Sequence, residues 1–64
     1  MKQLKELRFV PIGQNFEYHG EIYCCLPQMV INLDSRRHTI NCVKNENGAM
    51  IASYIPDGAQ ILLK

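Results

Sequence analysis

The sequence lacks tryptophan and carries no large excess of charge of either sign. Seven Lys and Arg residues balance six Asp and Glu residues, so the formal net charge is +1. That balance gives no overall attraction to nucleic acid or to an anionic membrane. No apolar run approaches the roughly 20 residues of a membrane-spanning helix. We therefore expect no membrane association, and nucleic-acid binding would need a local cluster of charge.

A secretory signal is not evident either, because no long apolar stretch follows Lys2. Three cysteines are an odd number, whereas small secreted domains usually carry an even set. These features predict an intracellular protein with reduced thiols. A disulfide between Cys42 and either Cys24 or Cys25 is sterically conceivable on neighbouring strands, but the predicted compartment argues against it. After export, one cysteine would be left over for intermolecular pairing.

The chain is short, with 64 residues, so we expect a single domain over 1–64. Its apolar fraction of 47% is normal for a folded protein. A domain of this size buries only about 60% of the surface that its unfolded chain exposes. Below about 70–80 residues, stability usually requires a disulfide, a metal, unusually good packing or a partner subunit. The isolated chain is therefore expected to be marginally stable.

Turn signals are frequent and evenly spread, at the spacing of about 8–12 residues that is typical of a β-sandwich or barrel. Pro11-Ile12-Gly13 fits a type I turn, with Pro at the second position and Gly at the fourth. His19-Gly20 and Asn47-Gly48 fit two-residue hairpin loops. The polar segment 34–37 and Pro56-Asp57-Gly58 provide the other breaks.

Between the turns lie short runs rich in residues that favour a pleated sheet. The runs are Leu7 to Val10, Asn15 to Tyr18, Glu21 to Leu26, Met29 to Leu33, Thr39 to Lys44, Ala49 to Ile55 and Gln60 to Leu63. They predict an all-β fold, either a small five- or six-stranded antiparallel barrel or a curled sheet. Only Lys2 to Leu7 has a helical pattern, and it is too short to hold a helix without docking.

Several of these runs are apolar on both faces. Ile22 and Cys24 share one face of their strand, while Tyr23 and Cys25 share the other. A domain this small has little interior for two apolar faces. Either the sheet curls tightly, or one face contacts another molecule, so we expect a homodimer or an obligate partner interface.

Metal-binding and catalytic patterns are weak. A zinc site would need Cys24, Cys25, Cys42 and His38, but adjacent cysteines point to opposite faces of a strand. His38 and Cys42 are about 13 Å apart in an extended strand, too far for one ion. At least two cysteines are expected to be small buried hydrophobic residues. No nucleophile, triad or phosphate loop accompanies the histidines. We therefore expect no enzyme activity and no metal or cofactor.

The densest positive cluster is Arg36-Arg37-His38, which is expected in a loop. In a loop it would contact phosphates or an acidic protein surface, or form a solvated hairpin tip. Nearby cations and stacking tyrosines would complete a surface for single strands of nucleic acid. The candidate binding residues are therefore Arg36, Arg37, His38, Lys44, Tyr23 and Tyr54.

The order of turn and core residues has a family resemblance. It runs Pro11-x-Gly13-x-x-Phe16, continues with Gly20-x-x-Tyr23, and closes with an acidic turn and a final strand. This resembles short, mostly uncharacterised β proteins of bacteriophages and prophages, with the pattern P-x-G-x-x-F-x-x-x-G-x-x-Y. The resemblance implies an SH3-like small barrel. It also implies an accessory protein in the cytoplasm of a bacterial host that binds and modulates a host protein, such as a defence component.

Three functions remain open at this point. The first is a non-catalytic protein-interaction module of phage or prophage origin. The second is a nucleic-acid-binding barrel that uses the Arg36-Arg37-His38 loop and exposed tyrosines. The third is an enzyme or small-ligand binder. A barrel of this size rarely encloses the roughly 300 Å³ of a ligand pocket, although a dimer could form one at its seam.

Overall fold

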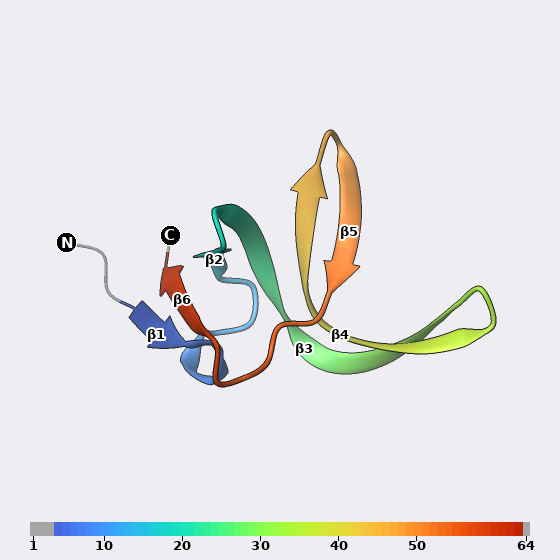
Figure 1. Cartoon of the computed structure of the whole chain (residues 1–64), viewed down its shortest axis with the longest axis horizontal. Coiled ribbons are helices and arrows are strands. Elements are labelled where there is room, and N and C mark those ends of the chain that lie inside the picture. Colours follow the sequence, from blue (N-terminus) through green and yellow to red (C-terminus); the bar gives the residue numbers. More distant parts are fainter. Residues whose placement is uncertain (1–3, 64) are drawn as a thin grey trace.

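The chain forms one six-stranded antiparallel sheet with the strand order β1-β6-β2-β3-β4-β5 (Figure 1). The structure is a computed structural model that describes residues 4–63. Its elements are β1 (Leu4–Glu6), the short 3-10 helix η1 (Leu7–Phe9), β2 (Asn15–Tyr18), β3 (Glu21–Leu33), β4 (Arg36–Glu46), β5 (Ala49–Ser53) and β6 (Gln60–Leu63). The all-β prediction is confirmed. Within residues 4–63, no helix is long and apolar enough to cross a membrane.

The sheet curls but does not close. Within the described residues, β1 pairs only with β6 and β5 pairs only with β4, so these two strands are the edges of the sheet. The curled sheet is therefore the correct form of the prediction, and the barrel is wrong. Leu4–Glu6, in the segment with the short helical pattern, is a strand, and the first residues of that segment lie outside the described ones.

Two segments near the start of the chain differ from the predicted strand and turn. Leu7–Phe9 is a 3-10 turn, which ends where the Val10 amide donates to the Leu7 carbonyl at 2.9 Å. The next turn lies one residue later than predicted, because the Gln14 amide donates to the Pro11 carbonyl at 3.1 Å. Gly13 then occupies the third position with φ of 91°, as a type II turn requires.

The three hairpin loops are two-residue turns with left-handed backbone. His19-Gly20, Asp34-Ser35 and Asn47-Gly48 all have positive φ at both residues, which is the conformation of a type I′ turn. The hairpins at His19-Gly20 and Asn47-Gly48 confirm the prediction. The polar break at 34–37 is shorter than predicted, because Arg36 and Arg37 already belong to β4.

β3 is one long strand where the sequence predicted two, because it continues through Pro27. Proline is tolerated in strands at edges and bulges, where its missing N–H is not needed. Residues 26–28 stand opposite the single Asn41, between the pairs Cys25↔Cys42 and Met29↔Ile40. This irregularity bends the ribbon of β3 and β4, and the part beyond it extends away from the rest of the molecule (Figure 1).

The core lies on one face of the remaining sheet. Its fully buried side chains are Phe16, Ile61 and Cys42, and the Phe16 ring stacks on Tyr23 at 5.6 Å between centroids. The buried amide of Asn41 replaces strand pairing where β5 ends. Its Nδ2 donates to the Ile55 carbonyl at 2.6 Å, and the Ile55 N–H donates to its Oδ1 at 3.0 Å.

Candidate functional site

The projecting part of the β3–β4 hairpin is the candidate functional site. We call it the arm, and define it as Met29–Leu33, the turn Asp34-Ser35, and residues 36–40; the rest of the described chain is the body. The two strands of the arm pair in register from Met29↔Ile40 to Leu33↔Arg36. In Figure 1 the arm is the green-to-yellow hairpin at the right. Among residues 4–63, no other strand pairs with it beyond its root.

Both outer edges of the arm are open among residues 4–63. On the β3 side, pairing with the β2 segment ends at Cys25, whose N–H and C=O bond to Gln14 and Gly13 at 3.0 and 2.8 Å. On the β4 side, pairing with β5 ends at Cys42, opposite Ser53. Unpaired edges of this kind offer rows of backbone donors and acceptors to another chain.

Apolar side chains are exposed on both faces of the arm. Val30 is 59% exposed on one face, while Leu33 and Met29 are 53% and 38% exposed on the other. Ile40 is buried at the root. Exposed apolar residues that cluster on one element are a mark of interaction sites.

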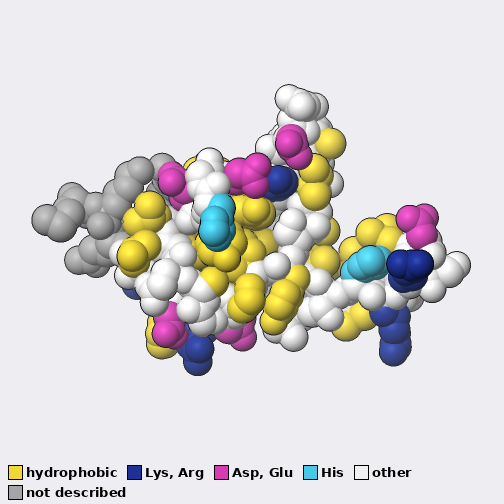
Figure 2. Space-filling view, in the orientation of Figure 1, with side chains coloured by type: hydrophobic (Ala, Val, Ile, Leu, Met, Phe, Trp, Pro, Cys, Tyr) yellow, Lys and Arg dark blue, Asp and Glu magenta, His cyan; other side chains and the backbone are white. Residues whose placement is uncertain are grey.

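Positive charge accompanies this apolar surface. Arg36, Arg37 and His38 stand opposite Leu33, Asn32 and Ile31 respectively, and all three are exposed. In residues 4–63, no carboxylate lies within 4.0 Å of either guanidinium, although Arg8 pairs with Glu6 at 2.8 Å. The space-filling view shows the dark blue and cyan side chains beside yellow ones at the end of the arm (Figure 2). The charges of the arm are therefore available to a partner.

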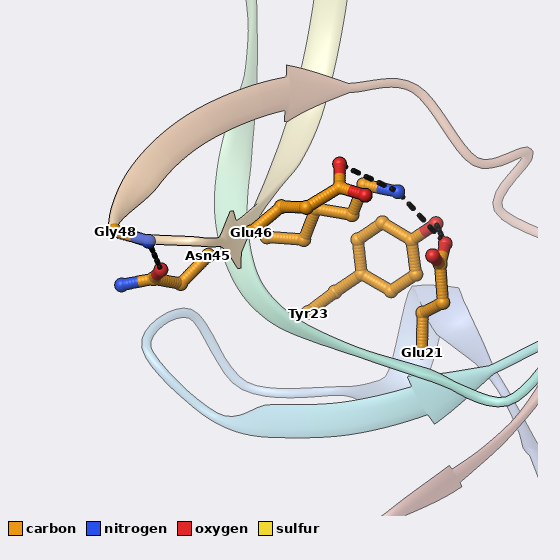
Figure 3. Close-up of polar contacts among 6 residues, drawn as sticks. Glu21, Tyr23, Asn45, Glu46 and Gly48 are labelled. Atoms are coloured by element: carbon orange, nitrogen blue, oxygen red, sulfur yellow. Dashed lines mark hydrogen bonds and ion pairs between the residues drawn. The ribbon is translucent and has the colours of Figure 1, made fainter.

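Lys44 belongs to a different cluster, in the body. Its Nζ lies 2.9 Å from Glu21 Oε2 and 3.8 Å from Glu46 Oε2, and the Tyr23 hydroxyl donates to Glu21 at 3.2 Å (Figure 3). The hydrogen bond with Glu21 raises the pKa of Lys44, and the hydrogen bond with Lys44 lowers the pKa of Glu21. The positive charge of Lys44 is thus paired with carboxylates of the body. It is up to about 26 Å along the strand from Arg36.

The predicted tyrosines do not form a surface with the cations of the arm. Tyr23 is only 9% exposed and packs on Phe16, and burial raises the pKa of its hydroxyl. Tyr54 is 48% exposed but follows β5 in the body. The structure divides five of the six candidate residues into two groups: Tyr23 and Lys44 are cross-strand partners in the body, and Arg36, Arg37 and His38 lie together in the arm. The three arm residues are in a strand and not in the predicted loop.

Sequence reasoning missed the apolar part of the site, which is Met29, Val30 and Leu33. The signal was present, since the alternation predicts apolar side chains on both faces of this run. The alternation does not reveal that this part of β3 extends past the end of β2 and pairs with β4 alone among residues 4–63. Only the pairing between strands that are distant in sequence shows this.

The cysteines are divided between the two faces of the sheet. Cys25 and Cys42 are Cα partners and both are buried, which confirms that two cysteines serve as small core residues. Burial raises the pKa of Cys42 to about 11 and also raises that of Cys25. Cys24 lies half-buried on the other face. Over residues 4–63, no group of three or more His, Cys, Asp and Glu side chains could hold a metal ion.

A shallow hollow occurs on the opposite face of the body from the core. Its volume is about 300 Å³, and its lining includes Ile22, Cys24, Val43 and Met50 together with two asparagines. The volume reaches the lower end of the range for ligand pockets. The hollow lies on a single open sheet, and no charged side chain lines it. It therefore offers little to fix the orientation of a small ligand.

No known protein family, curated protein or solved structure matches this chain.

Proposed function

We propose that this chain is a non-catalytic protein-binding module, and that the arm binds its partner. The observation that carries the proposal is the combination of exposed Met29, Val30 and Leu33 with the unpaired Arg36 and Arg37 on one projecting hairpin. An isolated two-stranded hairpin is at best marginally stable in water. A partner that covers the arm would remove its apolar surface from water and satisfy its charges.

The charge of the arm indicates the chemistry of the partner. Three cationic or near-cationic side chains are offset there by Asp34 alone. A second copy of the same arm would bring like charges together, which costs free energy. The partner is therefore a different protein, with a surface that is acidic and partly apolar. The homodimer that the sequence suggests would be recognised by a doubled mass in solution.

The resemblance to phage and prophage β proteins supports a bacterial partner. In that setting the chain is an accessory protein in the host cytoplasm, and its partner is a host protein such as a defence component. This part of the proposal depends on the pattern of turn and core residues.

Photocrosslinking in bacteria tests the proposal. A photoreactive amino acid at Val30 is expected to capture one major protein, and the same group at Gln60, an exposed position of the body, is not. The captured protein is then purified, and its dissociation constant for the full chain is measured. Arg37→Glu is expected to weaken this binary complex by about tenfold or more, and Lys5→Glu, the matched charge reversal in the body, by less than about twofold.

Two results would overturn the proposal. One is a purified pair that does not bind, or that responds equally to Arg37→Glu and Lys5→Glu. The other is binding of a single-stranded oligonucleotide that weakens with salt and is lost in Arg37→Glu. The second result would favour the nucleic-acid alternative, although Lys44 and Tyr23 are already engaged within the body.

A further inference from the structure

The turn at the end of the arm determines which backbone groups face outward. Asp34 and Ser35 form a two-residue loop with φ of 50° and 63°. Residues that flank such a loop exchange both of their backbone hydrogen bonds across the hairpin. Leu33 and Arg36 are that pair. Because hydrogen-bonded pairs alternate with non-hydrogen-bonded ones, the next hydrogen-bonded pairs are Ile31↔His38 and Met29↔Ile40.

The intervening pairs therefore turn their backbone groups away from the hairpin. Val30↔Thr39 and Asn32↔Arg37 are the non-hydrogen-bonded pairs. The N–H and C=O groups of Arg37 and Thr39 face the outer edge of β4, and those of Val30 and Asn32 face the outer edge of β3. Neither edge has a strand partner in the part of the chain that the structure describes.

We infer that the β4 edge of the arm binds an extended acidic segment of the partner as an added β-strand. The inference rests on the proposed function and names the edge and the kind of segment. Strand addition to an open edge is a common mode of peptide recognition, in which main-chain hydrogen bonds supply affinity and side chains supply specificity.

Charge selects the β4 edge over the β3 edge. A strand beside β4 would place its side chains about 5 Å from those of Arg36, Arg37 and His38, where opposite charges are favourable. The β3 edge offers Val30 and Asn32, which carry no charge. The three cations are consecutive, so they alternate between the faces of the arm. The segment that fits has acidic residues at successive positions, flanked by β-branched residues opposite Thr39 and Ile40.

The test uses a synthetic peptide with the palindromic sequence Val-Thr-Val-Glu-Glu-Glu-Val-Thr-Val, which can pair in either strand direction. Its binding to the full chain is measured by fluorescence anisotropy. Thr39→Pro removes one outward donor from the β4 edge, and Asn32→Pro removes an outward donor from the β3 edge. Neither substitution deletes a hydrogen bond between β3 and β4, because each residue belongs to a non-hydrogen-bonded pair, Val30↔Thr39 or Asn32↔Arg37. Proline is tolerated at such edge positions.

We expect Thr39→Pro to weaken peptide binding by about tenfold or more and Asn32→Pro by less than about twofold. Two further peptides carry N-methyl groups on alternate residues, in the two possible frames. At least one of them should fail to bind, because methylation removes the donors that face β4. Circular dichroism and proton NMR of the two proline variants check that each retains the fold of the parent chain.

Three outcomes would overturn the inference: equal losses in the two proline variants, full binding by both methylated peptides, or no binding at a peptide concentration of about 1 mM. Full binding by the methylated peptides would mean attraction between charges without strand pairing. The proposed function fails separately. If the partner captured at Val30 depends on Arg37 but is unaffected by Thr39→Pro, then the arm is the interface and strand addition at the β4 edge is wrong.

Discussion

The body and the arm are built from the same two long strands but differ in what surrounds them. In the body, β3 has β2 on one side and β4 on the other, and the face that carries Phe16 and Cys42 is covered. In the arm, β3 and β4 pair with no other strand of residues 4–63. Val30 and Leu33 are more than half exposed there. A strand stabilises the fold when it has neighbouring strands on both edges and one covered face. A strand without them is available for binding, even when its composition is similar.

The boundary between these regions is the irregularity opposite Asn41. Asn41 bonds to Ile55 on the body side, so this buried amide anchors the root of the arm to the chain after β5. Ile40, the first residue of the arm on this strand, is still buried, and residues 36–39 beyond it are exposed. The contrast predicts that stability resides in the body and that the arm contributes little to it.

Substitution in the core should have the largest effect. Phe16→Ala is expected to cost about 3–5 kcal/mol of unfolding free energy, because it removes a fully buried ring from a packed site. For a domain this small that cost is comparable to the whole stability. In the arm, Val30→Ala should cost less than about 0.5 kcal/mol. Urea unfolding followed by circular dichroism measures both, and similar costs for the two variants would contradict the division into body and arm.

The root amide should come next. Asn41→Ala leaves the N–H and C=O of Ile55 buried without partners and is expected to cost about 2–4 kcal/mol. Asn32→Ala removes an exposed amide of the same kind from the arm and should change the unfolding free energy by less than about 0.5 kcal/mol. Chemical denaturation of the two variants compares them directly. A cost at position 32 as large as that at position 41 would show that the arm is packed in solution.

Alkaline pH should destabilise the body through its buried thiols. Burial raises the pKa of Cys42 from 9.0 to about 11, so the folded state holds this proton more tightly than the unfolded state. That contribution is complete below pH 9 and is lost as the pH rises from about 9 towards 11, which amounts to about 2–3 kcal/mol. Stability measured from pH 8 to 10.5 should fall less steeply in Cys42→Ala than in the parent chain. Cys24→Ala, on the open face, should keep the steep fall.

The smallest effect is expected at the turn of the arm. Ser35 has φ of 63°, a conformation that glycine adopts without steric cost. Ser35→Gly should stabilise the hairpin by about 0.5–1 kcal/mol and slow amide exchange at Ile31 and His38 by about two- to fivefold. In β5 of the body, Ser53→Gly should speed local exchange, because glycine weakens a regular strand. Faster exchange in the arm of Ser35→Gly would mean that another contact holds this turn.

Much of the local structure could be predicted from the sequence. His19-Gly20 and Asn47-Gly48 mark their hairpins because few residues accept a left-handed backbone. Phe16, a core residue of the family pattern, is indeed fully buried. The joining of two predicted strands through Pro27 could not be predicted, because a proline is excluded only where its N–H would be needed, and that depends on where β2 ends.

The candidate site was predicted only in part. Arg36, Arg37 and His38 stand out as a run of charge, but their strand conformation depends on a turn that uses only Asp34 and Ser35. Tyr23 and Lys44 have the residue types of a binding surface, yet packing on Phe16 and an ion pair with Glu21 occupy them. The apolar residues of the arm are recognised as part of the site only from the strand pairing, which shows no further strand beside β3 and β4 there among residues 4–63.

By itself, the amino-acid sequence determined where the chain is extended, where it reverses, and which side chains share a face of each strand. These are local properties, set by the two-residue period of a strand and by the backbone preferences of turn residues. The tertiary structure decided which apolar faces are covered and which stay exposed. Coverage depends on contacts between residues far apart in the chain, such as Phe16↔Leu63 and Asn41 with Ile55, and no local pattern encodes those.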